Sequence, residues 1–247
     1  MRKILIIILL ACSLVAEADK WYIATAANGG SDTDGDGSAA HPWLTLKHAA
    51  DTITGAGFAG DTIVVGAGTF TEPTQVALSA GVSIYGAGAT SIITTGAALS
   101  PIISLPSVAE GTNGAQSISY IQVDGDLTAV SLIYVSGRSN VDIHHCTFVD
   151  ALTYGVTFRG KIDAVGAAPT TYATGNKFRN NTMTNCGSYV SDGRAGLEYS
   201  GQDGFLIEDN VIIQPDRGTG YHGHCIKSVI NYGFSKGVKI RYNTLAV

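Results

Sequence analysis

The segment between residues 192 and 228 holds most of the side chains that could carry out chemistry. The candidates that it contains are Asp192, Arg194, Glu198, Asp203, His222, His224 and Lys227. Carboxylate, imidazole and amine groups of this kind serve as general acids and bases, and the cations among them can bind an anionic substrate. A purely structural interpretation is equally open, in which Glu198 and Lys227 form a surface ion pair and the histidines hydrogen-bond backbone groups at a bend.

Two of these residues, Glu198 and Lys227, take equivalent positions when three short segments are aligned. The segments are Gly155-Val-Thr-Phe158, Gly196-Leu-Glu-Tyr199 and Cys225-Ile-Lys-Ser228. Because side chains alternate between the two faces of a strand, the alignment predicts an inward aliphatic row of Val156, Leu197 and Ile226. It also predicts an outward row of Thr157, Glu198 and Lys227.

A second repeat follows the pattern apolar-x-x-Asn/Cys-x-apolar. Its fourth positions are Cys146, Asn181, Asn210 and Asn243, with spacings of 35, 29 and 33 residues. Unequal spacings suit a solenoid whose coils keep their strands and vary their loops. We expect the Asn residues to occupy the bends in the left-handed backbone region and to hydrogen-bond along the axis, with Cys146 inward on its own coil.

Composition agrees with an all-β solenoid. The 247 residues include 31 Gly, 45% hydrophobic residues and only 14% charged residues. That charge content is too low for a helical bundle, and the apolar content is too high for disorder. The net charge of −5 and the absence of a Lys/Arg run past residue 3 argue against a nucleic-acid partner. We therefore predict a right-handed parallel β-helix solenoid, formed by residues 19–247 as a single domain.

The N-terminus is typical of an export signal. Basic residues 2 and 3 precede an apolar run over residues 4–11, and Ala16-Glu-Ala18 matches a cleavage site, which makes 1–18 a signal peptide. The apolar run is too short to be a transmembrane segment. A second interpretation is a lipoprotein signal that ends before Cys12, which would then carry a lipid anchor. Both interpretations predict a secreted or cell-surface protein.

Residues 19–60 are predicted to form an N-terminal cap with one short α-helix. Thr45 is the expected N-cap, and Leu46, Ala49, Ala50 and Ile53 follow at helical spacing. The loop Asp32-Thr-Asp34-Gly-Asp36-Gly37 begins like a calcium loop, but position twelve is Trp43 rather than Glu, so it is not an EF-hand. Cys146, Cys186 and Cys225 have no C-x-x-C spacing and are expected to be buried free thiols.

The cap and first coil resemble those of secreted pectate-lyase-like β-helix proteins. The resemblance is carried by Trp21-Tyr-Ile, Asn28-Gly-Gly-Ser-Asp32, His41-Pro-Trp-Leu-Thr45, Gly60-Asp-Thr-Ile and Ala67-Gly-Thr-Phe70. It covers nearly all of the chain after the signal and implies the β-helix fold, with coils at residues 61–247. It also implies that a full member of the superfamily carries further C-terminal turns.

The stretch Cys225-Ile-Lys227-Ser228 is similar to the Lys-Ser strand of alginate and chondroitin lyases. That similarity implies β-elimination on an acidic polysaccharide, with Lys227 as the base. We add His224 and Arg194 as catalytic candidates, His222 and Asp203 as substrate-binding candidates, and Glu198 as a ligand for calcium. The sequence departs from those lyases where their acidic calcium ligands precede this Lys, because His222 and His224 stand there instead.

Two other functions are compatible with the same residues. Asp203 followed by His222-Gly-His224 loosely resembles polygalacturonases, which hydrolyse their substrate with a pair of carboxylates. A non-catalytic surface or adhesion module is the other alternative. Convergence of Glu198, Lys227 and His224 in one groove with a second carboxylate would favour an enzyme.

Overall fold

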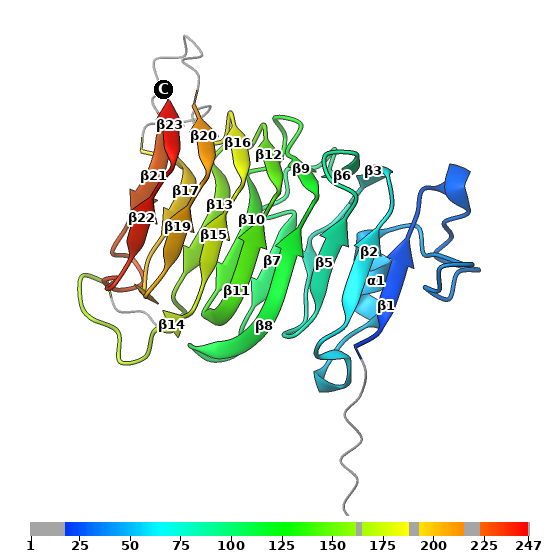
Figure 1. The fold of residues 1–247 in the computed structure, drawn as a ribbon, viewed down its shortest axis with the longest axis horizontal. Coiled ribbons are helices and arrows are strands. Elements are labelled where there is room, and N and C mark those ends of the chain that lie inside the picture. Colours follow the sequence, from blue (N-terminus) through cyan, green and yellow to red (C-terminus); the bar gives the residue numbers. More distant parts are fainter. Residues whose placement is uncertain (1–17, 162–164, 188–192, 215–222, 247) are drawn as a thin grey trace, which may run out of the picture.

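The computed structural model describes residues 18–161, 165–187, 193–214 and 223–246. Within these ranges the chain winds into a parallel β-helix, in which successive coils add strands to three long sheets, here called A, B and C (Figure 1). Every strand pair is parallel, as predicted. Crossovers between parallel strands are right-handed in nearly all proteins, which agrees with the predicted hand.

The strands of sheet A, in spatial order, are β1 (Lys20–Ile23), β2 (Thr62–Val65), β5 (Ser83–Gly86), β8 (Thr112–Ser119), β11 (Arg138–His144), β15 (Lys177–Arg179), β19 (Leu206–Glu208) and β22 (Lys239–Arg241). Sheet B contains β3 (Gly68–Thr71), β6 (Ser91–Thr94), β9 (Gln122–Asp124), β12 (Thr147–Val149), β16 (Thr182–Thr184), β20 (Val211–Ile213) and β23 (Thr244–Ala246). Sheet C contains β4 (Val76–Ala77), β7 (Ile103–Pro106), β10 (Ser131–Ser136), β13 (Tyr154–Arg159), β17 (Ala195–Tyr199) and β21 (His224–Ser228). A separate pair joins β14 (Ala173–Thr174) to β18 (Gln202–Asp203).

The bend between sheets A and B differs in detail from the prediction. The left-handed residue is the one before the inward bend residue, which is Asn on three coils, Cys146 on one and Ile121 on another: Tyr120, His145, Asn180, Asp209 and Tyr242 have φ between 54° and 57°. A run over 118–123 that looks like one strand is therefore divided at Tyr120 into β8 and β9. The Asn side chain faces inward, where its amide group forms hydrogen bonds with the neighbouring coil.

The predicted Asn ladder is present. The side-chain Oδ1 of Asn210 accepts hydrogen bonds from the backbone N and Nδ2 of Asn181, at 3.0 and 3.1 Å. Asn243 receives the equivalent pair from Asn210, at 3.0 and 2.8 Å. Cys146 takes the same inward position, and its backbone N donates to Asn181 at 3.0 Å. Buried amide groups are thus satisfied from coil to coil.

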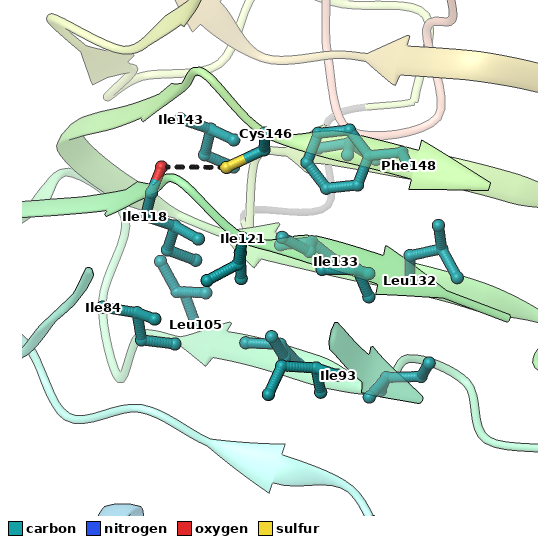
Figure 2. Packing of buried hydrophobic residues seen from close by; sticks show 14 of the residues in the cluster. Ile84, Ile93, Leu105, Ile118, Ile121, Leu132, Ile133, Ile143, Cys146 and Phe148 are labelled. Carbon is teal, nitrogen blue, oxygen red and sulfur yellow. Dashed lines mark hydrogen bonds between the residues drawn. The ribbon is translucent and has the colours of Figure 1, made fainter. Parts of the chain in front are cut away.

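The core consists of aliphatic and aromatic rows that run along the axis. Ile84, Ile118 and Ile143 lie in register on consecutive strands of sheet A, and all three are fully buried. Figure 2 shows these side chains in adjacent coils, with the thiol of Cys146 directed at the carbonyl oxygen of Ile118. All three described cysteines are buried and free, which confirms the expectation of free thiols. Burial raises the pKa of the Cys146 thiol to about 12.

The N-terminal end is covered by α1 (Leu46–Thr52), which packs against β1, β2 and β4. Thr45 is its N-cap, as predicted, because its side chain accepts from the backbone N of His48 at 3.0 Å. The buried carboxylate of Glu72 also accepts from the first backbone N–H groups of this helix, and burial raises the pKa of Glu72. Short 3-10 turns lie at Ala26–Asn28 and Ala56–Phe58. Among the described residues, no helix is long and apolar enough to span a bilayer.

Candidate functional site

The outward row predicted from the sequence exists on sheet C. Thr157 of β13 pairs with Glu198 of β17, which in turn pairs with Lys227 of β21. The row extends through Tyr134 of β10 to Ser104 of β7. The inward row is also as predicted: Val156 and Leu197 are fully buried in the core, and Ile226 packs against it.

Beside this row, the strict alternation of inward and outward residues is interrupted. Tyr154 and Thr157 of β13 therefore both face outward, although they are three positions apart. Leu132 and Ile133 are consecutive in β10, yet both are fully buried in the core. In β13 a Cβ on Gly155 would meet the sulfur of the core residue Met183, and Val156 beside it is also in the core. Two successive inward positions therefore separate Tyr154 from Thr157, and both of these line the outer surface.

A groove of about 400 Å³ runs over the outer face of β7, β10 and β13. Its lining combines hydroxyl groups, aromatic rings and one cation: Gln75, Ser100, Pro101, Ser104, Val130, Ser131, Tyr134, Tyr154, Thr157 and Arg159. These lining residues include no carboxylate. The groove can therefore accept a ligand that carries negative charge without like-charge repulsion from its walls.

Arg159 is held in this groove by a buried carboxylate. Its Nε and Nη2 atoms both donate to Oε1 of Glu198, the first at 3.1 Å. The other oxygen, Oε2, lies 4.0 Å from Nζ of Lys227. The Glu198 side chain is only 2% exposed, whereas those of Arg159 and Lys227 are 19% and 30% exposed. One carboxylate thus lies beneath two cations that reach the surface.

Three tyrosine rings surround the Arg159 guanidinium. Its central carbon lies 5.7, 5.5 and 5.4 Å from the ring centroids of Tyr134, Tyr154 and Tyr232. Burial would lower the pKa of Arg159, but the hydrogen bond and charge of Glu198 outweigh it and raise that pKa. Burial also raises the pKa of the Tyr134 phenol, although Arg159 opposes the shift. Both groups keep their protons at neutral pH and can donate hydrogen bonds to a ligand.

Arg194 joins this cluster from the start of β17. Its Nη1 donates to the hydroxyl of Tyr154 at 2.7 Å, and its guanidinium lies 5.5 Å from that ring. His224 pairs with Ala195 on the neighbouring strand, and its backbone N bonds to the carbonyl of Arg194. The His224 side chain is exposed. The structure therefore places Arg194, Glu198, His224 and Lys227 on one sheet, toward β21 and beyond the lining of the groove.

The other two predicted site residues are not in this group. Asp203 belongs to β18 in the separate two-stranded pair, and its Oδ2 lies 3.4 Å from Nζ of Lys236. Lys236 in turn lies over the ring of Tyr172, 4.4 Å from its centroid. His222 lies outside the described residues. A second carboxylate is thus not among the residues that contact Glu198 or line the groove in the described structure.

The candidate metal ligands have other partners. Glu198 is engaged by Arg159 as described, and Asp32 accepts from the backbone N of Leu44 and Thr45 and from the Thr45 hydroxyl. No group of three or more His, Cys, Asp or Glu that could hold a metal ion is found in the part of the chain that the structure describes. The calcium site remains a prediction from the sequence.

Sequence reasoning missed the groove residues Tyr134, Tyr154 and Arg159, and also Tyr232, which contacts Arg159. Arg159 could have been predicted from the sequence. It follows Thr157 by two positions in the same strand and must therefore lie on the same face of the sheet. Tyr154 carried no such signal, since the doubled inward position before Thr157 breaks the period. Tyr232 lies in a loop after β21, and its approach to β13 depends on how that loop folds.

The chain was compared with known proteins. No protein-family model matches the sequence, and no curated protein matches it. Among solved structures, a rhamnogalacturonan lyase superposes with a TM-score of 0.49 at 13% identity, covering 86% of this chain and 62% of that one. The ORF18 protein of Geobacillus virus E2 has a TM-score of 0.42 at 12% identity, covering 92% of this chain and 47% of that one. This chain therefore spans less than two thirds of either protein, and likeness at this level says nothing about activity.

Proposed function

We propose that this β-helix is an exported protein that binds an acidic polysaccharide in the groove on sheet C. The observation that carries the proposal is Arg159, a cation fixed by Glu198 and three tyrosine rings in the wall of a groove whose lining has no carboxylate. The groove crosses successive parallel strands. It therefore suits a linear polymer, because outward positions repeat from coil to coil along the axis of the β-helix.

The chemistry of the lining fits a uronic acid unit. A guanidinium has five N–H donors, and the two bonds to Glu198 leave others for a sugar carboxylate. Tyrosine rings offer apolar faces to the C–H faces of a pyranose, while their hydroxyl groups can bond its oxygens. Because Glu198 already holds the arginine in place, little side-chain entropy is lost on binding.

Cleavage by β-elimination is a second candidate, favoured by the position of Lys227. It lies on the same outward row as Thr157, two strands beyond β13. β-Elimination needs a cation to neutralise the sugar carboxylate and a base to remove the adjacent proton, the roles proposed for Arg159 and Lys227. A polymer that reaches Lys227 must run past the groove along this row. Two-carboxylate hydrolysis gains no support, because neither Glu198 nor Asp203 lines the groove.

Calorimetric titration with short oligomers of pectate, alginate and chondroitin tests the proposal. We expect binding to at least one of them and a loss of that binding in Arg159→Ala. Lys47→Ala, on α1, is the charge-matched control and should bind like the unmodified protein. Absence of binding to all three glycans, or equal binding by Arg159→Ala, would overturn the proposal.

Ultraviolet absorbance of unsaturated sugar ends then separates an enzyme from a binding module. Product formation that disappears in Lys227→Ala supports the lyase. Binding without any product, with and without added calcium, supports the non-catalytic surface module.

A further inference from the structure

The outer face of sheet A carries two straight rows of side chains that are remote from the groove on sheet C. The first row contains Lys20, Thr62, Ser83, Ser117, Asp142, Lys177, Leu206 and Lys239. The second contains Tyr22, Val64, Tyr85, Ser119, His144, Arg179, Glu208 and Arg241. We call these sixteen residues the A face. Its eight strands lie side by side in Figure 1 and span roughly 34 Å at about 4.8 Å per step.

The half of the A face nearest α1 is a platform of rings and hydroxyl groups. A groove of about 400 Å³ there is lined by Lys20, Tyr22, Thr62, Val64, Ser83, Tyr85 and Ser117. Tyr85 is 50% exposed, although a large aromatic side chain normally gains by burial. Tyr120 at the adjoining bend lies 5.3 Å from the Tyr85 ring and is stacked on His145 at 4.9 Å, which extends the rings along the axis.

The other half of the A face is cationic. Lys177 and Lys239 are exposed on the first row, on either side of Leu206, and with Arg241 they line a groove of about 190 Å³. Arg179 and Arg241 are paired with Asp142 and Glu208. With Lys20 of the other half, the A face has five Lys or Arg residues against the two carboxylates, a net charge of +3. Because the whole chain has a net charge of −5, the rest of it carries −8.

From this arrangement we infer that the A face is a second binding surface for a linear acidic polysaccharide. Sugar rings pack on Tyr22 and Tyr85, and carboxylates further along the same polymer pair with Lys177 and Lys239. The members of each pair are two strands apart, about 10 Å along the axis, so the two rings and the two ammonium groups have the same spacing. This surface shares its ligand class with the proposed groove, and in that respect it rests on the proposed function.

Affinity electrophoresis in gels that contain long polygalacturonate or alginate tests the inference. We expect Lys177→Ala/Lys239→Ala to weaken retention on the order of tenfold, and Tyr22→Ala/Tyr85→Ala to weaken it as well. A matched double variant, Lys47→Ala/Lys236→Ala, removes the same charge elsewhere and should migrate like the unmodified protein. Circular dichroism and thermal unfolding confirm that each variant is folded.

The outcomes separate this inference from the proposed function. Loss of retention in Arg159→Ala, with no loss in either A-face variant, overturns the A face and leaves the groove intact. Loss in the A-face variants with none in Arg159→Ala supports the A face and contradicts the groove. Retention by a DNA-containing gel that depends on Lys177 and Lys239 but not on the tyrosines would show anion exchange only, and would overturn the inference.

Discussion

The outer faces of sheets C and A use the same cross-strand chemistry in two different environments. On sheet C, Arg159 reaches a Glu198 side chain that is 2% exposed, and tyrosine rings surround the guanidinium. On sheet A, Arg241 reaches Glu208 with an N–O distance of 2.8 Å, but the two side chains are 52% and 17% exposed. A buried pair fixes one geometry and is costly to break, whereas an exposed pair contributes little and can exchange partners.

The difference in exposure determines what each face is suited to bind. The sheet C face holds its cation in a single orientation, which favours recognition of one sugar unit at a defined place. The A face presents cations that water and salt can reach, which favours loose attraction of a long anionic polymer. Four measurements test this contrast between the faces.

The largest expected effect comes from removal of the buried carboxylate. Glu198→Ala leaves Arg159 and Lys227 without their shared counter-charge, and we expect the free energy of unfolding to fall by about 3–5 kcal/mol. Denaturant unfolding followed by circular dichroism measures it. Glu208→Ala is the matched control on the A face and should cost less than about 1 kcal/mol. Similar losses from the two variants would contradict the contrast between the faces.

A smaller effect is expected when Arg159 keeps its charge but loses its planar fork. Arg159→Lys should weaken binding of a short acidic oligosaccharide by about 10- to 100-fold, which corresponds to one charge-assisted hydrogen bond. Calorimetry at fixed salt gives the change. Unaltered affinity would mean that the groove recognises positive charge alone, as the A face is proposed to do.

Salt should affect the two faces unequally. An increase in ionic strength from about 0.01 M to 0.15 M shortens the screening length from about 30 Å to 8 Å. We expect retention by a long polymer to fall on the order of tenfold and binding of a hexamer in the groove to fall about twofold. Equal salt dependence for polymer and hexamer would argue that one site binds both.

The smallest effect concerns His144 on the A face. Burial, with Arg179 and His145, lowers its pKa below 6.5, although Asp142 opposes the shift. The unfolded chain then binds a proton more readily than the folded chain, so this residue reduces stability as the pH falls below 6.5. Thermal unfolding from pH 7.5 to 5 should therefore show a shallower pH dependence in His144→Gln. An identical pH dependence in both proteins would contradict the assignment.

Sequence reasoning located the row on sheet C but not the groove beside it. Thr157, Glu198 and Lys227 could be aligned because each follows a Gly or Cys and an aliphatic residue, and the structure confirms their register. The consecutive inward positions of Gly155 and Val156 obey no simple period, so the turn of Tyr154 toward Arg159 could not be read from a pattern.

The bends illustrate the same limit. The Asn ladder was predictable because one residue type recurs at one position of the repeat. The left-handed backbone lies one residue earlier. His145, Asn180 and Asp209 are of types that favour this conformation, but Tyr120 and Tyr242 are not, so no single residue type marks the position. That conformation is imposed by the bend of the coil, because it is kept at Tyr120 and His145, which Ile121 and Cys146 follow rather than Asn.

Each complete coil gives one strand to sheet A and one to sheet C, and this shared origin links the growth of the two surfaces. Tandem duplication of a coil would lengthen both by one strand spacing, about 4.8 Å. A new coil would join the ladder if it retained the inward Asn, as Asn210 does between Asn181 and Asn243. If both surfaces bind polysaccharide as proposed, duplication of coils would set how many sugar units each surface could contact, and substitutions at outward positions would set which units it selects.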